Sequence, residues 1–450
     1  MKEKGFVKKH FSQLQFIAFG FFIMILFGAV LLTLPFASRS GRSVGFLDAL
    51  FTSTSAGCVT GLVVRDTSLG WSAFGQIIIL LLIQTGGLGF ISIGVFFSVL
   101  MRRKIGLRER GLLKESINSL EIGGVVKLAK KILFGTLLFE AAGAFLLSFR
   151  FIPDYGVFKG IWFSVFHSVS AFCNAGFDLL GASCGEYSSL SAYSKDILVN
   201  LVIMFLIIIG GIGFMVWDDL SRYRFAFRKY RLHSKIVLLT TGVLIALGSF
   251  VFLITERNGV LAQMGLQEKL LSCAFSAVTP RTAGFNTVDT AKLSNAGKLF
   301  TMILMFIGGS PGSTAGGIKT TTVFVLFMYI DRHIRQYPSV DVFGRRLADE
   351  AVKTSATIIS INLFLVMAAG MMIASVESAG LTDIMFEVCS AMGTAGMSTG
   401  ITRELSAFSK LVLVGLMYLG RVGSLSFALL FMQDKKPANI MQPKEEISVG

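Results

Sequence analysis

Four short glycine segments recur along the chain at nearly even spacing, and their residue types suit the coordination of a cation. Their central glycines lie 115, 108 and 112 residues apart. Because glycine tolerates positive φ, the backbone around it can turn successive carbonyl oxygens toward one axis and replace part of the water shell of an ion. Four such segments could close a ring. The predicted filter consists of Val59, Thr60, Gly61, Asn174, Ala175, Gly176, Thr282, Ala283, Gly284, Thr394, Ala395 and Gly396.

A second glycine motif follows each of these segments, at 86–89, 210–213, 308–311 and 420–423. In the first two copies we interpret the glycines as packing residues that let helices approach closely. The third copy continues as a glycine-rich stretch with a proline, which excludes a uniform helix. Unwound backbone at membrane depth must line water or be buried in protein, so we predict a flexible loop that can act as a gate. It comprises Gly308, Gly309, Ser310, Pro311, Gly312, Ser313, Thr314, Ala315, Gly316 and Gly317.

Arg421 stands in the fourth copy where the other copies have glycine. A guanidinium inside a membrane commonly costs ~3 kcal/mol or more and faces an aqueous cavity or a partner. Beneath a cation filter its charge would repel the ion unless carbonyls of the broken helix offset it. We therefore assign Arg421 to the gate. A structural arginine bonded to helix ends is the alternative, and both roles are compatible if the gate loop is the partner.

The elements that must position these residues are membrane helices. The 450 residues are 53% apolar and only 15% charged, with 42 Phe and 7 Pro, which indicates an integral membrane protein. A span needs about 20 apolar residues. Eight such runs occur, at 14–35, 74–101, 125–149, 197–217, 235–255, 298–330, 354–375 and 410–432.

Between the members of each pair of spans lies a shorter apolar segment that leads into a glycine segment, at 44–57, 160–173, 267–280 and 381–393. These segments are too short to span, so they should enter and return on one side, with their partly negative C-terminal ends favouring a cation. We predict an all-α membrane protein of four pseudo-repeated units, each a membrane helix, a re-entrant pore loop and a second membrane helix, around a central potassium-channel-like pore. The units are 1–110, 111–232, 233–348 with a broken second helix, and 349–450 with a cytoplasmic tail.

Basic clusters set the expected orientation. Lys and Arg gather at 102–110 and 222–231, in loops that join the units. By the positive-inside rule these loops and both termini are cytoplasmic, and the glycine segments enter from outside. The net charge of +15 is then largely a topology signal, and we expect no nucleic-acid partner. The expected location is the cytoplasmic membrane.

The fourfold unit resembles the Trk/Ktr/HKT superfamily of potassium transporters over essentially the whole chain, and most of all the bacterial Ktr membrane subunit. The matching features are Val-Thr-Gly-Leu at 59–62, the stretch from Ala277 to Asn286, the stretch from Gly312 to Lys319, and Gly-Arg-Val-Gly at 420–423.

This resemblance implies potassium uptake, often sodium-dependent, by a homodimer with one pore per subunit. It also implies control by a cytoplasmic ring of nucleotide-binding RCK subunits, so a nucleotide would act only through a partner, with no covalent cofactor. In plant members a serine at the first filter glycine accompanies sodium transport, so Gly61 favours potassium. Pro311 departs from the small residue that the family pattern has there.

Motifs of enzymes are present but incomplete. G-x-S-x-G occurs at 308–312 and 396–400, but a serine hydrolase needs a base and an orienting partner. A phosphate loop is contradicted by Ile318 before Lys319, and the five cysteines lack metal spacing. We predict no enzyme. The alternative transport function is a secondary transporter of another small cation or solute with a broken-helix site at the midplane, which would predict an inverted repeat.

Overall fold

The computed structural model describes residues 13–89, 106, 110, 111, 114, 124–224 and 226–424. Helices make up almost all of the regular structure, as expected for an all-α protein. Within the described ranges the only strands are β1 (Asp341–Val342) and β2 (Arg345–Arg346), which pair antiparallel with Asp341 opposite Arg346.

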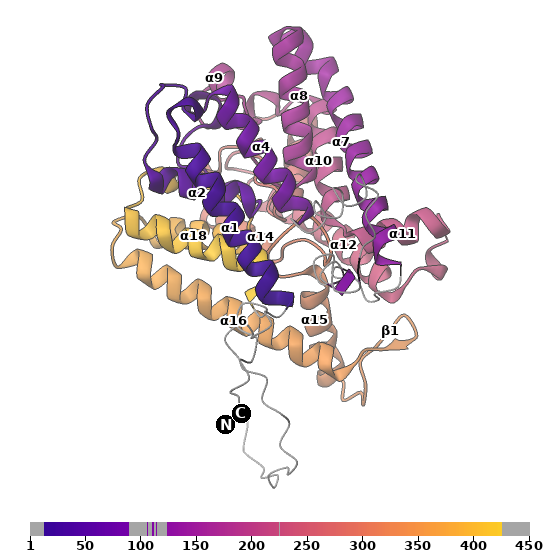
Figure 1. The fold of residues 1–450 in the computed structure, drawn as a ribbon. Coiled ribbons are helices and arrows are strands. Elements are labelled where there is room, and N and C mark those ends of the chain that lie inside the picture. The colour runs from indigo at the N-terminus through magenta and orange to yellow at the C-terminus, as the bar shows by residue number, and fades with distance from the viewer. Residues whose placement is uncertain are drawn as a thin grey trace, which may run out of the picture.

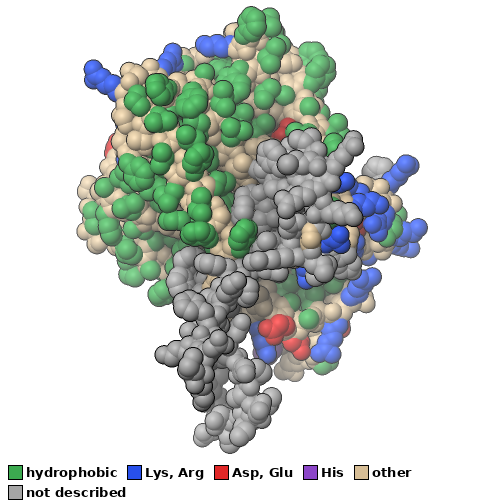
Figure 2. Space-filling model, viewed as in Figure 1, with side chains coloured by type: hydrophobic (Ala, Val, Ile, Leu, Met, Phe, Trp, Pro, Cys, Tyr) green, Lys and Arg blue, Asp and Glu red, His purple; other side chains and the backbone are tan. Residues whose placement is uncertain are grey.

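Four long helices carry the largest apolar surface. They are α1 (Gln13–Thr33), α7 (Val125–Tyr155), α12 (Leu232–Thr255) and α16 (Asp349–Ala374), and each is long and apolar enough to cross a membrane. Each exposes a large aromatic side chain: Phe27, Phe134, Phe250 and Phe364 are 60–72% exposed. Figure 2 shows hydrophobic side chains spread over the upper and left part of the visible face. Such an extended apolar surface is what lipid contact requires.

A short helix follows each long helix and packs against it. The C-terminal half of each short helix is buried, and each ends immediately before or within a few residues of a glycine segment. These helices occupy the four short apolar segments of the sequence almost residue for residue. They are α2 (Phe46–Gly57), α8 (Val157–Phe172), α13 (Leu266–Val278) and α17 (Leu381–Gly393).

A second apolar helix follows each short helix, and we call a long helix, its short helix and this second helix one set. The second helices are α4 (Ala73–Leu88), α10 (Ile197–Gly211), α14 (Asn295–Phe306) and α18 (Ala407–Val422). All four end at their glycine motif. After α10 the chain continues as α11 (Phe214–Tyr223), bent by 98°, and after α14 a loop leads to α15 (Thr320–Ile334). By length and composition the described chain therefore has four candidate spans, or five if α10 and α11 count as one. The eight-span arrangement stays a prediction.

The expectation that only the third copy interrupts its helix was wrong. Gly89 and Gly213, at the ends of the first two motifs, have φ of 78° and 94°, and Gly423 in the fourth has φ of 97°. A helix cannot continue through such left-handed backbone, so α4, α10 and α18 stop there. The glycines one turn earlier do serve packing. Gly86 and Gly210 lie so close to the carbonyls of Gly57 and Phe172 that no Cβ fits. The predicted spans 74–101 and 410–432 extend beyond the described residues, which end at 89 and 424 in these two regions.

The four sets follow one another around the molecule, and the last returns to the first (Figure 1). Each second helix packs against the short helix of the next set, and α18 packs against α2. A polar contact near the start of the helices marks each junction. These contacts are Trp162 Nε1 to Gln76 Oε1 (3.0 Å), Ser194 Oγ to Glu268 (2.8 Å), Lys298 to Asp383 (2.8 Å) and Lys410 to Asp48 (3.2 Å).

The remaining short elements connect these helices. They are η1 (Pro35–Ala37), α3 (Thr67–Gly70), α9 (Gly181–Cys184), η2 (Ser191–Tyr193), η3 (Phe227–Lys229), η4 (Thr290–Lys292) and η5 (Ile401–Arg403). The buried core surrounds the ends of the short helices, where Phe172, Phe275 and Phe386 are almost fully enclosed. This packing fixes the position of the glycine segments.

Candidate functional site

The four glycine segments share one unusual backbone conformation. In each, the central glycine and the residue two positions before it both have positive φ. Such φ values are uncommon for residues other than glycine and concentrate at functional sites. The values are 57° and 96° at Val59 and Gly61, 59° and 68° at Asn174 and Gly176, 77° and 84° at Thr282 and Gly284, and 49° and 78° at Thr394 and Gly396.

These segments meet as a closed ring, which we call the glycine ring. A Cβ added to Gly61 would lie 2.5 Å from the Ala175 carbonyl oxygen of the next segment. The same relation holds from Gly176 to the third segment, from Gly284 to the fourth, and from Gly396 back to the Thr60 carbonyl of the first. Each glycine thus faces the carbonyl that precedes the next glycine, and no larger residue fits without displacing backbone.

Hydroxyl side chains near the ends of the short helices hold the ring. Ser55 accepts a hydrogen bond from Gly61 N (3.0 Å), Ser170 donates to Phe177 O (2.7 Å) and Thr279 donates to Phe285 O (2.6 Å). The fourth segment differs, because its Ser390 hydroxyl makes no hydrogen bond to the described residues and only the Ser390 backbone carbonyl accepts, from Ala395 N at 2.8 Å. We did not predict these residues. The sequence does carry a signal for them, a Ser or Thr five or six positions before every central glycine.

Above the ring lies a cavity of about 360 Å³ that all four central glycines line. Its walls also carry the acidic residues Asp66, Asp178, Glu186 and Asp289, together with one basic residue, Arg403. The Arg403 guanidinium stacks on the Tyr187 ring at 3.7 Å. Burial and the nearby Asp66 raise the pKa of Asp178 to about 7, against the lowering effect of the Leu180 backbone N–H. We call this cavity the vestibule. Its excess of carboxylates favours cations.

The glycine-rich loop between α14 and α15 lies directly against the ring from the other side. Gly316 packs on the Thr394 side chain, and a Cβ on Gly317 would lie 2.8 Å from Gly393 O. The structure therefore brings the predicted gate residues, Gly308 to Gly317, together with the predicted filter residues.

Hydrogen bonds attach this loop to neighbouring sets. From the second set, Gly211 O accepts from Ser310 N (3.0 Å), Gly210 O accepts from Thr314 N (3.2 Å) and Phe214 N donates to Gly312 O (2.7 Å). Thr314 Oγ1 donates to Phe172 O at 3.1 Å, and Gly317 N donates to Gly420 O at 3.3 Å. Pro311 turns its carbonyl toward Gly213, where only a glycine leaves room. These bonds hold the loop in one defined conformation between the second and fourth sets.

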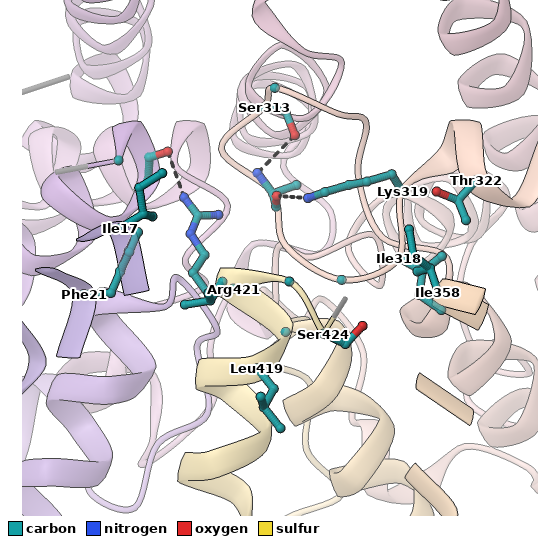
Figure 3. Close-up of a pocket in the computed structure, with 18 of the residues that line it drawn as sticks. Ile17, Phe21, Ser313, Ile318, Lys319, Thr322, Ile358, Leu419, Arg421 and Ser424 are labelled. Carbon is teal, nitrogen blue, oxygen red and sulfur yellow. Dashed lines mark hydrogen bonds between the residues drawn. The ribbon is translucent and has the colours of Figure 1, made fainter. Parts of the chain in front are cut away.

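Arg421 joins the loop to the first set, and Figure 3 shows its bond to a carbonyl of that set. Its Nη1 donates to Thr314 O, and its Nη2 donates to Gly86 O and, at 2.9 Å, to Gly87 O. Gly86 and Gly87 belong to the last turn of α4, where the carbonyls have no amide four residues further along the helix to accept from. The arginine therefore contacts both a helix end and the loop, the two partners that the sequence left open.

A second cavity, of about 310 Å³, lies on the side of the loop away from the ring. Loop residues, the ends of α4 and α18, and side chains of α1 and α16 line it, among them Phe21 and Asn362. Asn362 donates to Ser424 Oγ at 2.7 Å and so closes one wall. We call this space the inner cavity. Vestibule, glycine ring, loop and inner cavity lie one behind the other in that order.

Comparison with known proteins assigns the chain to a family. The family model described as TrkH, cation transport protein, matches residues 16–440. The potassium/sodium uptake protein NtpJ of Enterococcus hirae is 45% identical, covering 99% of this chain and 98% of its own. The Ktr system potassium uptake protein B of Bacillus subtilis is 38% identical, covering 100% and 99%. These relatives are ion transporters and not enzymes.

Among solved structures, the potassium transporter TrkH from Vibrio parahaemolyticus superposes with a TM-score of 0.72 at 18% identity, over 96% of this chain and 87% of that one. The fold is therefore TrkH-like, and the resemblance to the Trk/Ktr/HKT superfamily is confirmed. From the family match and the two relatives together, this chain is a member of the TrkH family of cation transport proteins.

Proposed function

We propose that this protein takes up potassium across the cytoplasmic membrane through a pore whose selectivity filter is the glycine ring. The observation that carries the proposal is the closed ring of four segments with one shared backbone conformation. A ring of backbone carbonyls can replace the hydration shell of K⁺. The named potassium uptake activity of the relatives supports the same ion. Sodium enters the name of one relative, and we propose it as a second ion or an activator.

The proposed architecture is that of four units around this pore. The short helices α2, α8, α13 and α17 enter the membrane and return, and the long and second helices make eight spans. Both termini and the basic loops are then cytoplasmic, and the vestibule faces outside. The acidic lining of the vestibule and the C-terminal ends of the short helices attract cations and repel anions.

The proposed gate is the loop from Gly308 to Gly317 together with Arg421. The loop separates the ring from the inner cavity, and Arg421 fixes it to the end of α4. A pore closed by an ordered loop needs a signal to open it. We propose that a cytoplasmic RCK-type ring, which binds the nucleotide, supplies the signal to a homodimer of this chain. The name of the second relative as a component of a Ktr system supports a partner subunit.

The test is uptake in a cell that lacks its own potassium transport. Expression of this chain should restore accumulation of potassium in preference to sodium, and co-expression of a cytoplasmic RCK partner should change the rate. Uptake of both ions at equal rates would contradict the filter assignment. A rate that no candidate partner alters would contradict the regulatory part only.

The alternative, a secondary transporter with a midplane site, draws on the break between α14 and α15. Broken helices hold ions in such transporters. Their repeats are inverted, however, whereas the four sets here meet in one ring with the same order of elements. Uptake that requires a stoichiometric second ion at every potassium concentration would favour this alternative.

A further inference from the structure

Lys319 occupies a position that its charge does not favour. It is the residue immediately before α15, at the helix end where the backbone carries a partial positive charge. Its side chain is partly buried and borders the inner cavity. In the described ranges no carboxylate forms an ion pair with Lys319, and Arg421 is bonded to the same loop nearby. Something other than an acid must hold this ammonium group.

The partners are carbonyls of the loop itself. Lys319 Nζ donates to Ala315 O at 2.8 Å, as Figure 3 shows, and to Gly316 O at 3.3 Å. The Ser313 hydroxyl accepts from Ala315 N at 3.3 Å and shapes the turn that presents these oxygens. With Arg421 on Thr314 O, three consecutive loop carbonyls are bonded to cationic side chains. An ammonium group is a compact monovalent cation, and backbone carbonyls are the ligands that a potassium filter uses.

We propose that the carbonyls of Ala315 and Gly316 form a site for a monovalent cation directly below the glycine ring, and that the Lys319 ammonium fills this site and acts as a tethered blocker. The inference rests on the proposed potassium pore. Gly316 packs on Thr394 of the ring, so an ion leaving the ring would reach these oxygens next. While Lys319 is bound, that ion meets a fixed like charge and ligands that are already occupied.

The structure also provides a place for the lysine to go. Lys319 lines the inner cavity of about 310 Å³, so its flexible chain can withdraw there when the loop moves. The loop carbonyls are then free for the permeating cation. In this scheme Arg421 anchors the loop and Lys319 occupies its cation site, which gives the two basic residues distinct tasks.

The first experiment measures rubidium uptake per incorporated molecule into vesicles that contain the full-length protein. Lys319→Met removes the ammonium at nearly constant length and should raise uptake at least threefold, whereas Lys319→Arg should stay within twofold of wild type. Lys159→Met, which changes an exposed lysine on α8, is the matched control and should leave uptake unchanged. Unchanged or lower uptake by well-incorporated Lys319→Met would overturn the proposal.

A charge-rescue measurement covers the case in which Lys319→Met fails to fold. Lys319→Cys is tested before and after reaction with an aminoethyl methanethiosulfonate, which adds a lysine-like ammonium, or with the neutral methyl reagent. Only the aminoethyl group should return uptake to the wild-type rate, and wild-type vesicles treated in the same way correct for the five native cysteines. Equal effects of the two reagents would overturn the proposal. If neither wild type nor any well-incorporated Lys319 variant takes up rubidium, the proposed pore itself fails, whereas transport that does not depend on residue 319 refutes the blocker alone.

Discussion

The glycine ring and the layer directly beneath it are built in opposite ways. In the ring, four segments repeat the same pair of positive φ values and the same glycine-to-carbonyl contact. Beneath it, the four second helices end differently: α4 stops, α10 bends into α11, α14 opens into the loop, and α18 presents Arg421. Coordination of one ion on an axis needs equal ligands from all sides. Blocking an ion pathway along the same axis needs only one element, such as the loop.

The loop keeps contacts with its own set, such as Thr320 N to Gly309 O at 3.0 Å, but it is also attached to other sets. The amides and carbonyls of the loop bond to α10, α11 and α18, so a movement of any of these helices would also move the loop. Among them α11 extends to the basic surface, where Asp218 pairs with Lys131 of α7 at 2.8 Å. A partner that shifts α11 would act on Gly312 through a single hydrogen bond from Phe214. The asymmetric layer is thus suited to receive a signal and the symmetric ring is not.

The largest effect should follow from breaking the symmetry of the ring. Gly61→Ser adds a Cβ at φ 96°, 2.5 Å from Ala175 O, which costs roughly 1 kcal/mol in backbone strain before any displacement. We expect the preference for potassium over sodium to fall at least tenfold, measured by ion competition in uptake. Gly176→Ser and Gly284→Ser should do the same. The control Gly415→Ser lies on α18 with open space around it. Unchanged selectivity in all three ring variants would refute the filter assignment.

The next prediction concerns the proposed gate loop, which lies in the layer beneath the ring. Deleting Gly312 and Ser313 shortens the loop and removes the Phe214 to Gly312 hydrogen bond. We expect potassium flux per expressed molecule to rise about tenfold and to depend less on a regulatory partner, with selectivity retained because the ring is untouched. Normal membrane levels without any gain in flux would show that the loop is not the gate.

A smaller effect is expected at Arg421, which anchors the loop but does not fill the axis. Arg421→Gln keeps much of the side-chain volume, removes the positive charge and cannot bridge Thr314 with Gly86 and Gly87. Flux should rise about threefold, and the double variant with the shortened loop should show no further gain because both changes act on one element. A purely structural arginine predicts lower expression and lower flux in both cases.

Much of the fold and of the candidate site could be predicted from the sequence because apolar runs and glycine spacing have a direct physical meaning. The four short helices lie where segments too short to span precede a glycine segment. Arg421 contacts the loop, which is one of the two partners expected for it. The breaks after α4, α10 and α18 were missed. A glycine that packs and a glycine with positive φ look the same in a sequence, and Gly213 combines both, since its φ is 94° and Pro311 O lies against it.

The contacts that depend on long-range closure could not be predicted either. The order in which the glycine segments face one another depends on α18 meeting α2, which no local pattern reveals. The anchoring hydroxyls Ser55, Ser170 and Thr279 were recognisable as a repeat, but their partners were not. Ser55 accepts from the amide of its central glycine, whereas Ser170 and Thr279 donate to the carbonyl of the residue that follows it. The contacts of Lys319 could not be predicted because its partners are carbonyls, and carbonyls are present at every residue.

The smallest predicted effect tests whether the ring side of the proposed pore is also uniform in charge. Asp178 breaks that uniformity, since burial and Asp66 raise its pKa to about 7. Its carboxyl is therefore mostly neutral at pH 6 and mostly charged at pH 8. A full charge at ~8 Å in a water-like medium changes the energy of a cation by about 0.5 kcal/mol, or roughly twofold in local concentration.

We expect potassium uptake at low external concentration to rise about twofold from pH 6 to pH 8 in wild type. In Asp178→Asn the rise should disappear, while the rate at saturating potassium should not change with pH in either protein. A rise that persists in Asp178→Asn would assign the titration to another group, and the vestibule would then act on the ring through Asp66, Glu186 and Asp289 alone.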